Sequence, residues 1–127
     1  MRILLISDDN LLQSTVKNFG ENTQASTSAY NTDPKPIKVL SSFLSRQPSV
    51  LIVDDDYLKP NSVEILESIR NVNKKTKIIF ASTDSSLELG KKVSQLGIYY
   101  YAIKPIDESE FKELLDSLLK TKSKQIN

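Results

Sequence analysis

The feature that most constrains the fold is an apolar run that ends in three consecutive carboxylates. Residues 50–53 are Val-Leu-Ile-Val, and Asp54, Asp55 and Asp56 follow directly. A strand that is apolar on both faces is buried on both faces, as in a parallel sheet covered by helices. The acids that end this strand are therefore expected at the carboxyl edge of the sheet, where open α/β sheets place their ligands.

Two further stretches repeat this pattern. Residues 3–6 are apolar and are followed, after one serine, by Asp8 and Asp9, whereas residues 101–103 end at Lys104. Each side chain taken alone has an ordinary explanation, because aspartates cap helices and a lysine in a loop is commonly solvated. Together they stand at the carboxyl ends of buried strands, so they describe a site for a cation and a phosphoryl group.

The composition limits the chemistry that such a site can use. The chain has 127 residues, enough for one domain with a single core, and its 17 basic and 16 acidic residues leave a net charge of +1. This balance argues against a surface that binds nucleic acid or membranes through charge alone. Because there is no cysteine and no histidine, disulfides, thiolate metal sites and the usual general base are excluded. Oxygen ligands for a hard cation remain available.

No targeting or membrane-spanning segment is expected. The chain enters its first strand within two residues, without the apolar core of a signal peptide, and no apolar run approaches the length that spans a bilayer. We therefore expect a cytoplasmic protein.

Apolar runs and amphipathic stretches alternate along the chain. Strands are expected at residues 2–7, 23–30, 50–53, 77–81 and 99–103, and helices at residues 10–21, 36–46, 62–72, 85–96 and 107–120. This alternation predicts one α/β domain, residues 1–120, with a doubly wound five-stranded parallel sheet in the flavodoxin-like order 2-1-3-4-5 and helices on both faces. Residues 121–127 are expected to form a polar carboxyl-terminal tail. The first and third strands are neighbours in this order, so Asp8, Asp9 and Asp54 are expected to meet.

Local signals place the helices more closely. Ser62 is expected to cap the helix after the central acids, residues 85–88 have a capping-box pattern, and Gly97 is expected to end the helix before the last strand. The helix over residues 36–46 is expected to face the sheet with four apolar side chains: Ile37, Leu40, Phe43 and Leu44.

The residues at the strand ends are suited to phosphoryl transfer. Mg²⁺ prefers oxygen ligands and keeps several waters, so Asp8, Asp9 and Asp54 supply enough carboxylates to hold it. Lys104 adds a point charge, and the hydroxyl of Ser82 can donate to a phosphoryl oxygen. Transfer to a carboxylate rests mainly on positioning and charge neutralisation, and these groups provide both.

With these residues in place, the sequence resembles the receiver domain of bacterial two-component response regulators, over the whole chain up to about residue 120. The resemblance is carried by Ser7-Asp8-Asp9-Asn10, by Asp54, by Ser82-Thr83, and by Gly97 through Tyr101 to Lys104-Pro105. It implies that Asp8, Asp9 and Asp54, with the backbone carbonyl of Asp56, hold Mg²⁺. It also implies that Ser82 and Lys104 hold the phosphoryl group, and that Tyr101 is the aromatic residue that reorients with Ser82.

The acceptor among the three central acids has to be chosen. Counting back from Pro60, the proline that the family usually has four residues after the acceptor indicates Asp56. Counting forward from the apolar run indicates Asp54, which ends the strand, whereas a side chain two residues further lies out on the loop. We choose Asp54. Leu58 then stands where the family usually has proline and Ser62 where it often has glycine, which leaves the shape of this loop open.

The resemblance also implies a signalling function. A histidine kinase or a phosphotransfer protein donates to Asp54, and the protein catalyses only its own phosphorylation and dephosphorylation. The surface formed by residues 85–96, residues 99–103 and the last helix then changes shape, for a downstream target, a fused output domain or a second copy of the chain. No direct contact with nucleic acid or membrane is implied.

Two other functions remain open. A receiver-like scaffold would bind partners without phosphorylation, and the altered loop favours it. A phosphatase of the haloacid-dehalogenase type would use Asp54, Asp56, Ser82 and Lys104, but its metal-binding acids come last in the chain, and no acidic pair follows Lys104 at a strand end. Nucleotide binding is not supported, because none of the three glycines lies in a phosphate-binding loop.

Overall fold

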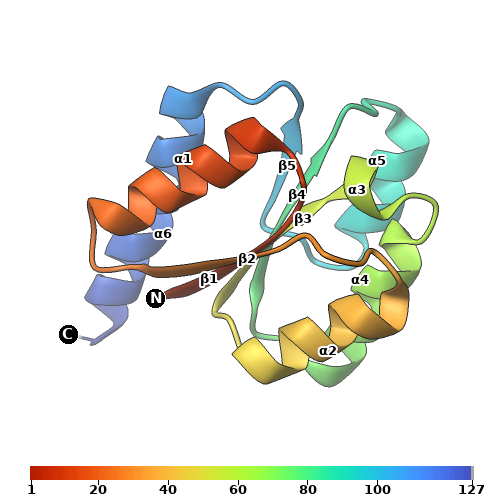
Figure 1. The fold of residues 1–127 in the computed structure, drawn as a ribbon, viewed down its shortest axis with the longest axis horizontal. Coiled ribbons are helices and arrows are strands. Elements are labelled where there is room, and N and C mark those ends of the chain that lie inside the picture. Colours follow the sequence, from red (N-terminus) through yellow and green to blue (C-terminus); the bar gives the residue numbers. More distant parts are fainter. Residues whose placement is uncertain (127) are drawn as a thin grey trace.

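The computed structural model describes the backbone of residues 1–126 and the side chains of residues 1–121. Its five-stranded sheet is parallel throughout and has the order β2-β1-β3-β4-β5, which confirms the predicted doubly wound, flavodoxin-like topology (Figure 1). The strands are β1 (Arg2–Ile6), β2 (Ser26–Tyr30), β3 (Val50–Asp54), β4 (Lys77–Ser82) and β5 (Tyr100–Ile103).

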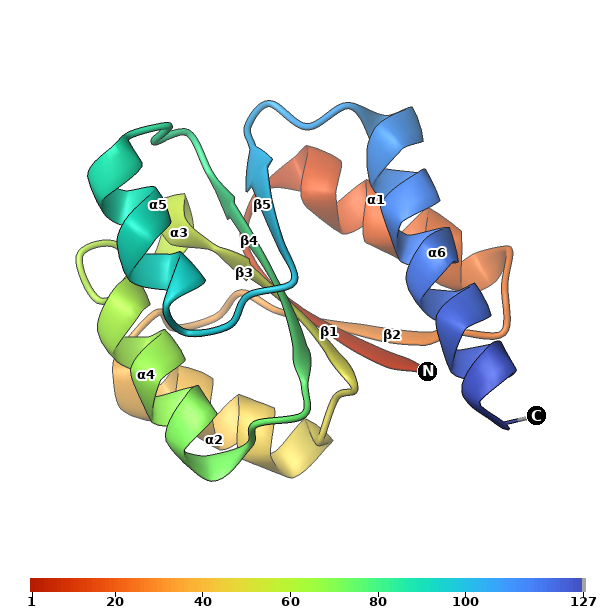
Figure 2. The ribbon, with the colours of Figure 1, turned by 180° about the vertical axis from the view of Figure 1, so that it is seen from behind.

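Helices cover both faces of this sheet. They are α1 (Asn10–Glu21), α2 (Pro36–Arg46), α3 (Asp55–Leu58), α4 (Ser62–Val72), α5 (Leu87–Ser94) and α6 (Glu108–Ile126). Helices α1 and α6 lie on one face, and α2, α4 and α5 lie on the other (Figures 1 and 2). The one-turn helix α3 was not predicted. It begins at the acid that follows β3 and lies at the carboxyl edge of the sheet.

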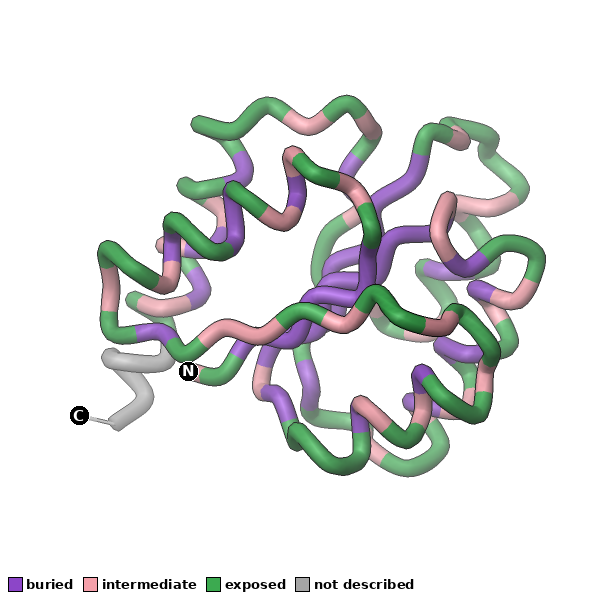
Figure 3. The backbone as a smooth tube through the Cα atoms, viewed as in Figure 1, coloured by how far each residue is buried: buried purple, intermediate pink, exposed green. Residues whose placement is uncertain are grey.

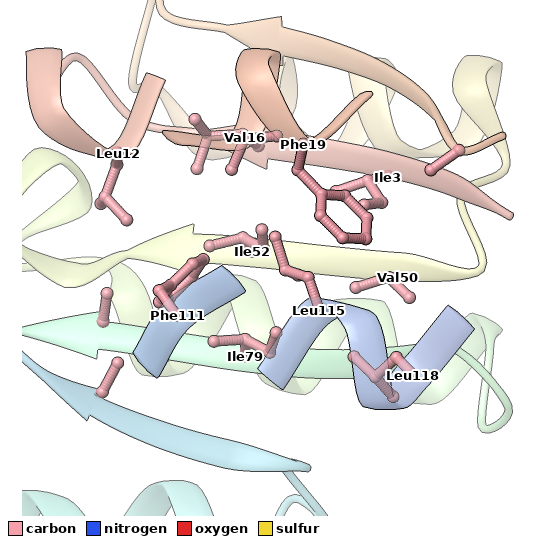
Figure 4. Packing of buried hydrophobic residues seen from close by; sticks show 14 residues of the cluster. Ile3, Leu12, Val16, Phe19, Val50, Ile52, Ile79, Phe111, Leu115 and Leu118 are labelled. Atoms are coloured by element: carbon pink, nitrogen blue, oxygen red, sulfur yellow. The ribbon is translucent and has the colours of Figure 1, made fainter. Parts of the chain in front are cut away.

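The sheet is buried because alternate side chains of each strand enter two separate cores. Every residue of β3 is buried, and the buried parts of the chain converge on the middle strands (Figure 3). On one face, Ile52 and Ile79 pack against Phe19 of α1 and Leu115 of α6 (Figure 4). Each such aliphatic side chain stabilises the fold by about 1.5–3 kcal/mol. The site residues at the ends of β3 and β4 therefore follow directly from the buried middle of the sheet.

The prediction for the inward face of α2 was half wrong. Phe43 and Val39 are buried and Leu40 is half-buried, but Ile37 and Leu44 are 72% and 55% exposed. Val39 and Phe43 are four residues apart and therefore share one narrow stripe of the helix. Ile37 and Leu44 fall outside this stripe, so they face away from the core.

Two predicted helix caps are shifted by one residue. Asn61 is the N-cap of α4, and Ser62 lies inside the helix, where its hydroxyl donates to the backbone carbonyl of Asp55 at 3.3 Å. Ser86 caps α5 by accepting from the amide of Leu89 at 3.3 Å, so the capping box expected for residues 85–88 does not form.

The remaining boundaries differ little from prediction. Strand β2 begins three residues later than expected, because the Thr23 hydroxyl donates to the carbonyl of Phe19 and belongs to the end of α1. Gly97 has the positive φ of 71° that a chain reversal before β5 requires. Helix α6 continues to Ile126, through the segment expected to be a polar tail, and Asn127 lies outside the described residues.

Candidate functional site

The site begins with Asp54, the last residue of β3. Its side chain is 1% exposed although it is a carboxylate. One oxygen, Oδ1, accepts from the amide of Asp56 at 3.0 Å and so caps the one-turn helix α3. A buried carboxylate is retained only where it is hydrogen-bonded or paired. The surrounding residues supply those partners.

Ser7 is one of these partners, and the sequence analysis assigned it no role. Strand β1 runs beside β3 with Ile6 opposite Val53, which brings the next residue of each strand together at the sheet edge. The buried Ser7 hydroxyl donates to Oδ2 of Asp54 at 2.6 Å and accepts from the amide of Asp9 at 2.9 Å. Its position in the sequence could have indicated this contact, because Ser7 is the first residue after the apolar run of β1.

The two acids that follow Ser7 take different positions. Asp9 caps α1, since its Oδ1 accepts from the amide of Leu12 at 3.0 Å, and its Oδ2 lies 3.2 Å from Nζ of Lys104. Burial raises the pKa of Asp9, but these bonds lower it by more, so the net shift is downward. Asp8 is exposed, and no hydrogen bond or ion pair within the described residues holds its side chain. Of the expected pair, the structure therefore brings only Asp9 to the cluster around Asp54.

Lys104 lies at the centre of the acids. Its Nζ donates to both carboxylate oxygens of Asp54, at 3.0 and 3.1 Å, and its side chain is 10% exposed. The same nitrogen lies 3.2 Å from Asp9 and 3.3 Å from Asp56. Burial lowers the pKa of Lys104, but the carboxylates outweigh it and raise the pKa to about 12. Lys104 therefore stays charged and gathers three carboxylates around one ammonium group.

Asp56 joins the cluster through its carboxylate, whereas the resemblance to receiver domains implied a role for its backbone carbonyl. Its oxygens accept from the amide and the hydroxyl of Thr83 at 2.9 and 2.8 Å, and from Lys59 at 3.0 Å. Burial opposes ionisation, but the Thr83 and Lys59 bonds hold the pKa of Asp56 well below its usual range. Asp56 therefore ties the start of the β4–α5 loop to α3.

Ser82, which was expected to hold a phosphoryl group, contacts Asp55 in this structure. Its hydroxyl donates to Oδ2 of Asp55 at 2.7 Å and accepts from the amide of Asp84 at 2.9 Å. Both Ser82 and Asp55 are buried. The sequence analysis gave Asp55 no role, because three identical residues in a row do not reveal which neighbour each one contacts.

Tyr101 connects the same loop to strand β5. Its hydroxyl donates to the backbone carbonyl of Asp84, and its ring lies 5.2 Å from that of Phe80, tilted by 60°. Burial raises the pKa of Tyr101. The neighbouring Tyr99 and Tyr100 are exposed, so only the third tyrosine of the run is directed toward the loop.

The donor atoms of this cluster fit a hard cation. No group of three or more acidic side chains in the described part of the chain is already spaced to hold a metal ion directly. Asp9, Asp54 and Asp56 nevertheless all lie within 3.3 Å of one positive nitrogen, and they offer only oxygen ligands, as Mg²⁺ prefers. Asp9 and Asp54 would hold such an ion once the ammonium of Lys104 moves aside.

Comparison with known proteins identifies the family. The family model of the response regulator receiver domain matches residues 3–116, so the chain belongs to this family. A probable C4-dicarboxylate response regulator DctR of Priestia megaterium is 27% identical over 116 residues, which cover 90% of this chain and 50% of that protein. An uncharacterized response regulatory protein of Staphylococcus epidermidis is 22% identical over 118 residues, 93% of this chain and 46% of that protein. The chain thus spans about half the length of these relatives.

Solved structures show the same fold. The chemotaxis response regulator CheY4 of Vibrio cholerae superposes with a TM-score of 0.74 at 16% identity, covering 91% of this chain and 96% of that chain. The N-terminal domain of an uncharacterized protein of Wolinella succinogenes gives a TM-score of 0.81 at 21% identity, covering 98% of each chain.

Within the described residues, no helix has the length and apolar character that crossing a bilayer requires.

Proposed function

We propose that this receiver domain accepts a phosphoryl group on Asp54. The observation that carries the proposal is the buried carboxylate of Asp54 at the end of the central strand, within 3.1 Å of the Lys104 ammonium through both oxygens. The Ser7 hydroxyl and the Asp56 amide fix the plane of the carboxylate. These bonds support the proposal, because they hold the carboxylate in one orientation at the carboxyl edge of the sheet.

In the proposed reaction, an oxygen of Asp54 forms a bond to phosphorus as the bond from phosphorus to the donor's nitrogen breaks. The Lys104 ammonium, at the centre of the cluster, is placed to neutralise the charge of the incoming phosphoryl oxygens. Mg²⁺ held by Asp9 and Asp54, with Asp8 and the carbonyl of Asp56 completing its ligands, would supply further charge neutralisation. The domain itself contributes positioning and charge, which such transfers chiefly require.

The partners follow from this reaction. A receiver domain implies a phosphodonor protein, and we propose a histidine kinase or a phosphotransfer protein. The output surface is proposed on α5, β5 and α6, where Leu87, Tyr100 and Ile103 are exposed. It would act on a downstream protein, on a fused output domain or on a second copy of the chain.

The test compares two adjacent aspartates. Incubation with acetyl phosphate or with a purified histidine kinase is expected to label the wild type and Asp55→Asn but not Asp54→Asn. Mass spectrometry of the intact protein measures the product, and the phosphorylated peptide identifies the residue. Label retained in Asp54→Asn would show that another carboxylate is the acceptor.

A scaffold that binds partners without phosphorylation is the second candidate. The hydrogen bonds of the site favour this candidate. Ser7, Asp56 and Lys104 all donate to Asp54, and Ser82 donates to Asp55, so these groups already have partners within the domain. Absence of label in the wild type with both donors would favour the scaffold. Partner binding that is identical in the wild type and Asp54→Asn would support it further.

A further inference from the structure

Asp55 has no part in the proposed transfer, yet it is a buried carboxylate whose side chain accepts a hydrogen bond from Ser82. It is 3% exposed, and Ser82, which donates to its Oδ2 at 2.7 Å, is fully buried. The nearest cation is the exposed Lys59, at 3.7 Å. Because a buried acceptor without a donor is costly, the Ser82 hydroxyl is the main group that makes this burial tolerable.

The hydroxyl of Ser82 has no further proton to give. Its single proton points to Asp55, and its oxygen accepts from the amide of Asp84. Within the described residues, Ser82 makes no hydrogen bond to Asp54, whose oxygens are held by Ser7, Asp56 and Lys104. A phosphoryl group on Asp54 can therefore gain the Ser82 hydroxyl only if Asp55 loses it.

The bond between Asp55 and Ser82 also determines where the β4–α5 loop lies. Asp84, which donates to Ser82, offers its backbone carbonyl to the hydroxyl of Tyr101. A continuous path of hydrogen bonds thus runs from Asp55 through Ser82 and Asp84 to Tyr101. Movement of Ser82 toward Asp54 would break this path at its first bond.

We propose that Asp55 is a positioning residue that holds the Ser82 hydroxyl in the resting conformation and opposes its transfer to a phosphoryl group on Asp54. This role rests on the proposed phosphorylation of Asp54. Each change to the phosphorylated conformation removes the Ser82 donor from the buried carboxylate of Asp55. A larger fraction of molecules must therefore carry a phosphoryl group on Asp54 before the β4–α5 loop moves. Two residues that are adjacent in sequence then have opposite effects on the same switch.

The first measurement needs no phosphodonor. NMR spectra of the unmodified protein are expected to show a Ser82 hydroxyl proton that exchanges slowly with water in the wild type and in Asp55→Asn, whose side-chain oxygen still accepts. Asp55→Leu keeps the branched shape without an acceptor and is expected to lose this protection and to shift the amide of Asp84. Equal exchange in the wild type and Asp55→Leu would overturn the inference, whatever the result for phosphorylation.

The second measurement titrates beryllium trifluoride, a stable phosphoryl mimic, in the presence of Mg²⁺ and follows the amides of Ser82 and Tyr101. Asp55→Leu is expected to lower the concentration at half-saturation by about tenfold, the effect of one hydrogen bond to a buried carboxylate, and Asp55→Asn by no more than about twofold. The effect of Asp55→Leu is expected to vanish in a Ser82→Ala background, because both substitutions remove the same bond.

Each other outcome has a definite meaning. A tenfold effect that persists in the Ser82→Ala background would overturn the inference, since Asp55 would then act through another residue. No mimic binding by the wild type would reject the proposed function and the opposing role with it, whereas a protected Ser82 hydroxyl would still show the resting bond. If Asp55→Leu does not fold, Asp55→Ala removes the acceptor in its place, and a Ser82 hydroxyl proton that exchanges as slowly in that variant as in the wild type would overturn the inference.

Discussion

The ammonium of Lys104 donates to both carboxylate oxygens of Asp54, at 3.0 and 3.1 Å, although the two residues are 50 positions apart in the sequence. Strands β3 and β5 are separated by β4, so this contact crosses the carboxyl edge of the sheet. Asp9 reaches the same nitrogen from the end of β1. One lysine therefore links the ends of β1, β3 and β5.

Removal of this ammonium is expected to reduce stability at neutral pH. Lys104→Met leaves the carboxylate of Asp54 buried without its cation, and breaking a buried pair in this way costs about 3–5 kcal/mol. Urea denaturation at pH 7 measures the change. Lys120→Met is the matched control, because Lys120 forms an exposed pair with Asp116 on α6 and is expected to change the free energy of unfolding by less than about 1 kcal/mol.

The same pair predicts an alkaline limit to stability. The pKa of Lys104 is raised from 10.5 to about 12, so its contribution is complete below pH 10.5 and is lost as the pH rises toward 12. The difference in unfolding free energy between the wild type and Lys104→Met is therefore expected to shrink across this window. Denaturation curves at several pH values measure it. Parallel pH profiles for the two proteins would contradict the assignment of the shift to Lys104.

Magnesium is expected to bind weakly, because it competes with Lys104 for the carboxylates. Asp9→Ala and Asp54→Ala are each expected to reduce the affinity at least about tenfold, since each removes one of the few carboxylate ligands. Asp8→Ala is expected to have a smaller effect, because the Asp8 side chain is exposed and has to turn inward. Amide shifts during a Mg²⁺ titration measure the affinities. Unchanged binding in both the Asp9 and Asp54 variants would reject the site.

The sequence was sufficient to predict the sheet but not the pairing of side chains at its edge. Apolar runs such as that of β3 fix burial on both faces, and together with the crossover rule they limit the strand order to a few topologies, of which the observed order is one. Asp54, Asp55 and Asp56 look alike in the sequence, yet they contact Lys104, Ser82 and Thr83 respectively.

The difference among these acids arises from the backbone. Asp54 still belongs to β3, whereas Asp55 and Asp56 lie in the one-turn helix α3 and therefore point in other directions. No periodicity in the sequence predicts so short a helix. Ile37 was misplaced for a similar reason, because a helix that lies over one narrow stripe buries fewer positions than its apolar pattern offers.

Ser7 offers a second test of the site. Ser7→Ala removes the buried donor to Oδ2 of Asp54 and the half-buried acceptor for the amide of Asp9. The loss is expected to cost about 1–3 kcal/mol of stability, measured by urea denaturation. Ser14→Ala, on the exposed side of α1, is the control and is expected to change stability by no more than about 0.5 kcal/mol. Equal effects of the two substitutions would contradict the role of Ser7.

The last prediction concerns the path from the site to the output surface. Tyr101 is the only one of the three consecutive tyrosines that bonds to the β4–α5 loop, through the carbonyl of Asp84. Phosphorylation adds about −1.5 to −2 charge at Asp54 and is expected to draw Ser82 and Lys104 toward it. Because the loop then moves, the bond from Tyr101 to Asp84 is expected to break, which frees the ring to leave its contact with Phe80 and changes the surface of β5 and α5.

Tyr101→Ala is therefore expected to leave phosphorylation of Asp54 nearly intact while it reduces the shifts that the phosphoryl mimic induces in β5 and α5. Tyr100→Ala is the matched control, because that ring is 47% exposed and has no bond to the loop. It is expected to leave those shifts unchanged, although it can weaken partner binding at the surface. Amide NMR with beryllium trifluoride measures both variants. Shifts of wild-type size across β5 and α5 in Tyr101→Ala would show that the signal reaches the surface without this residue.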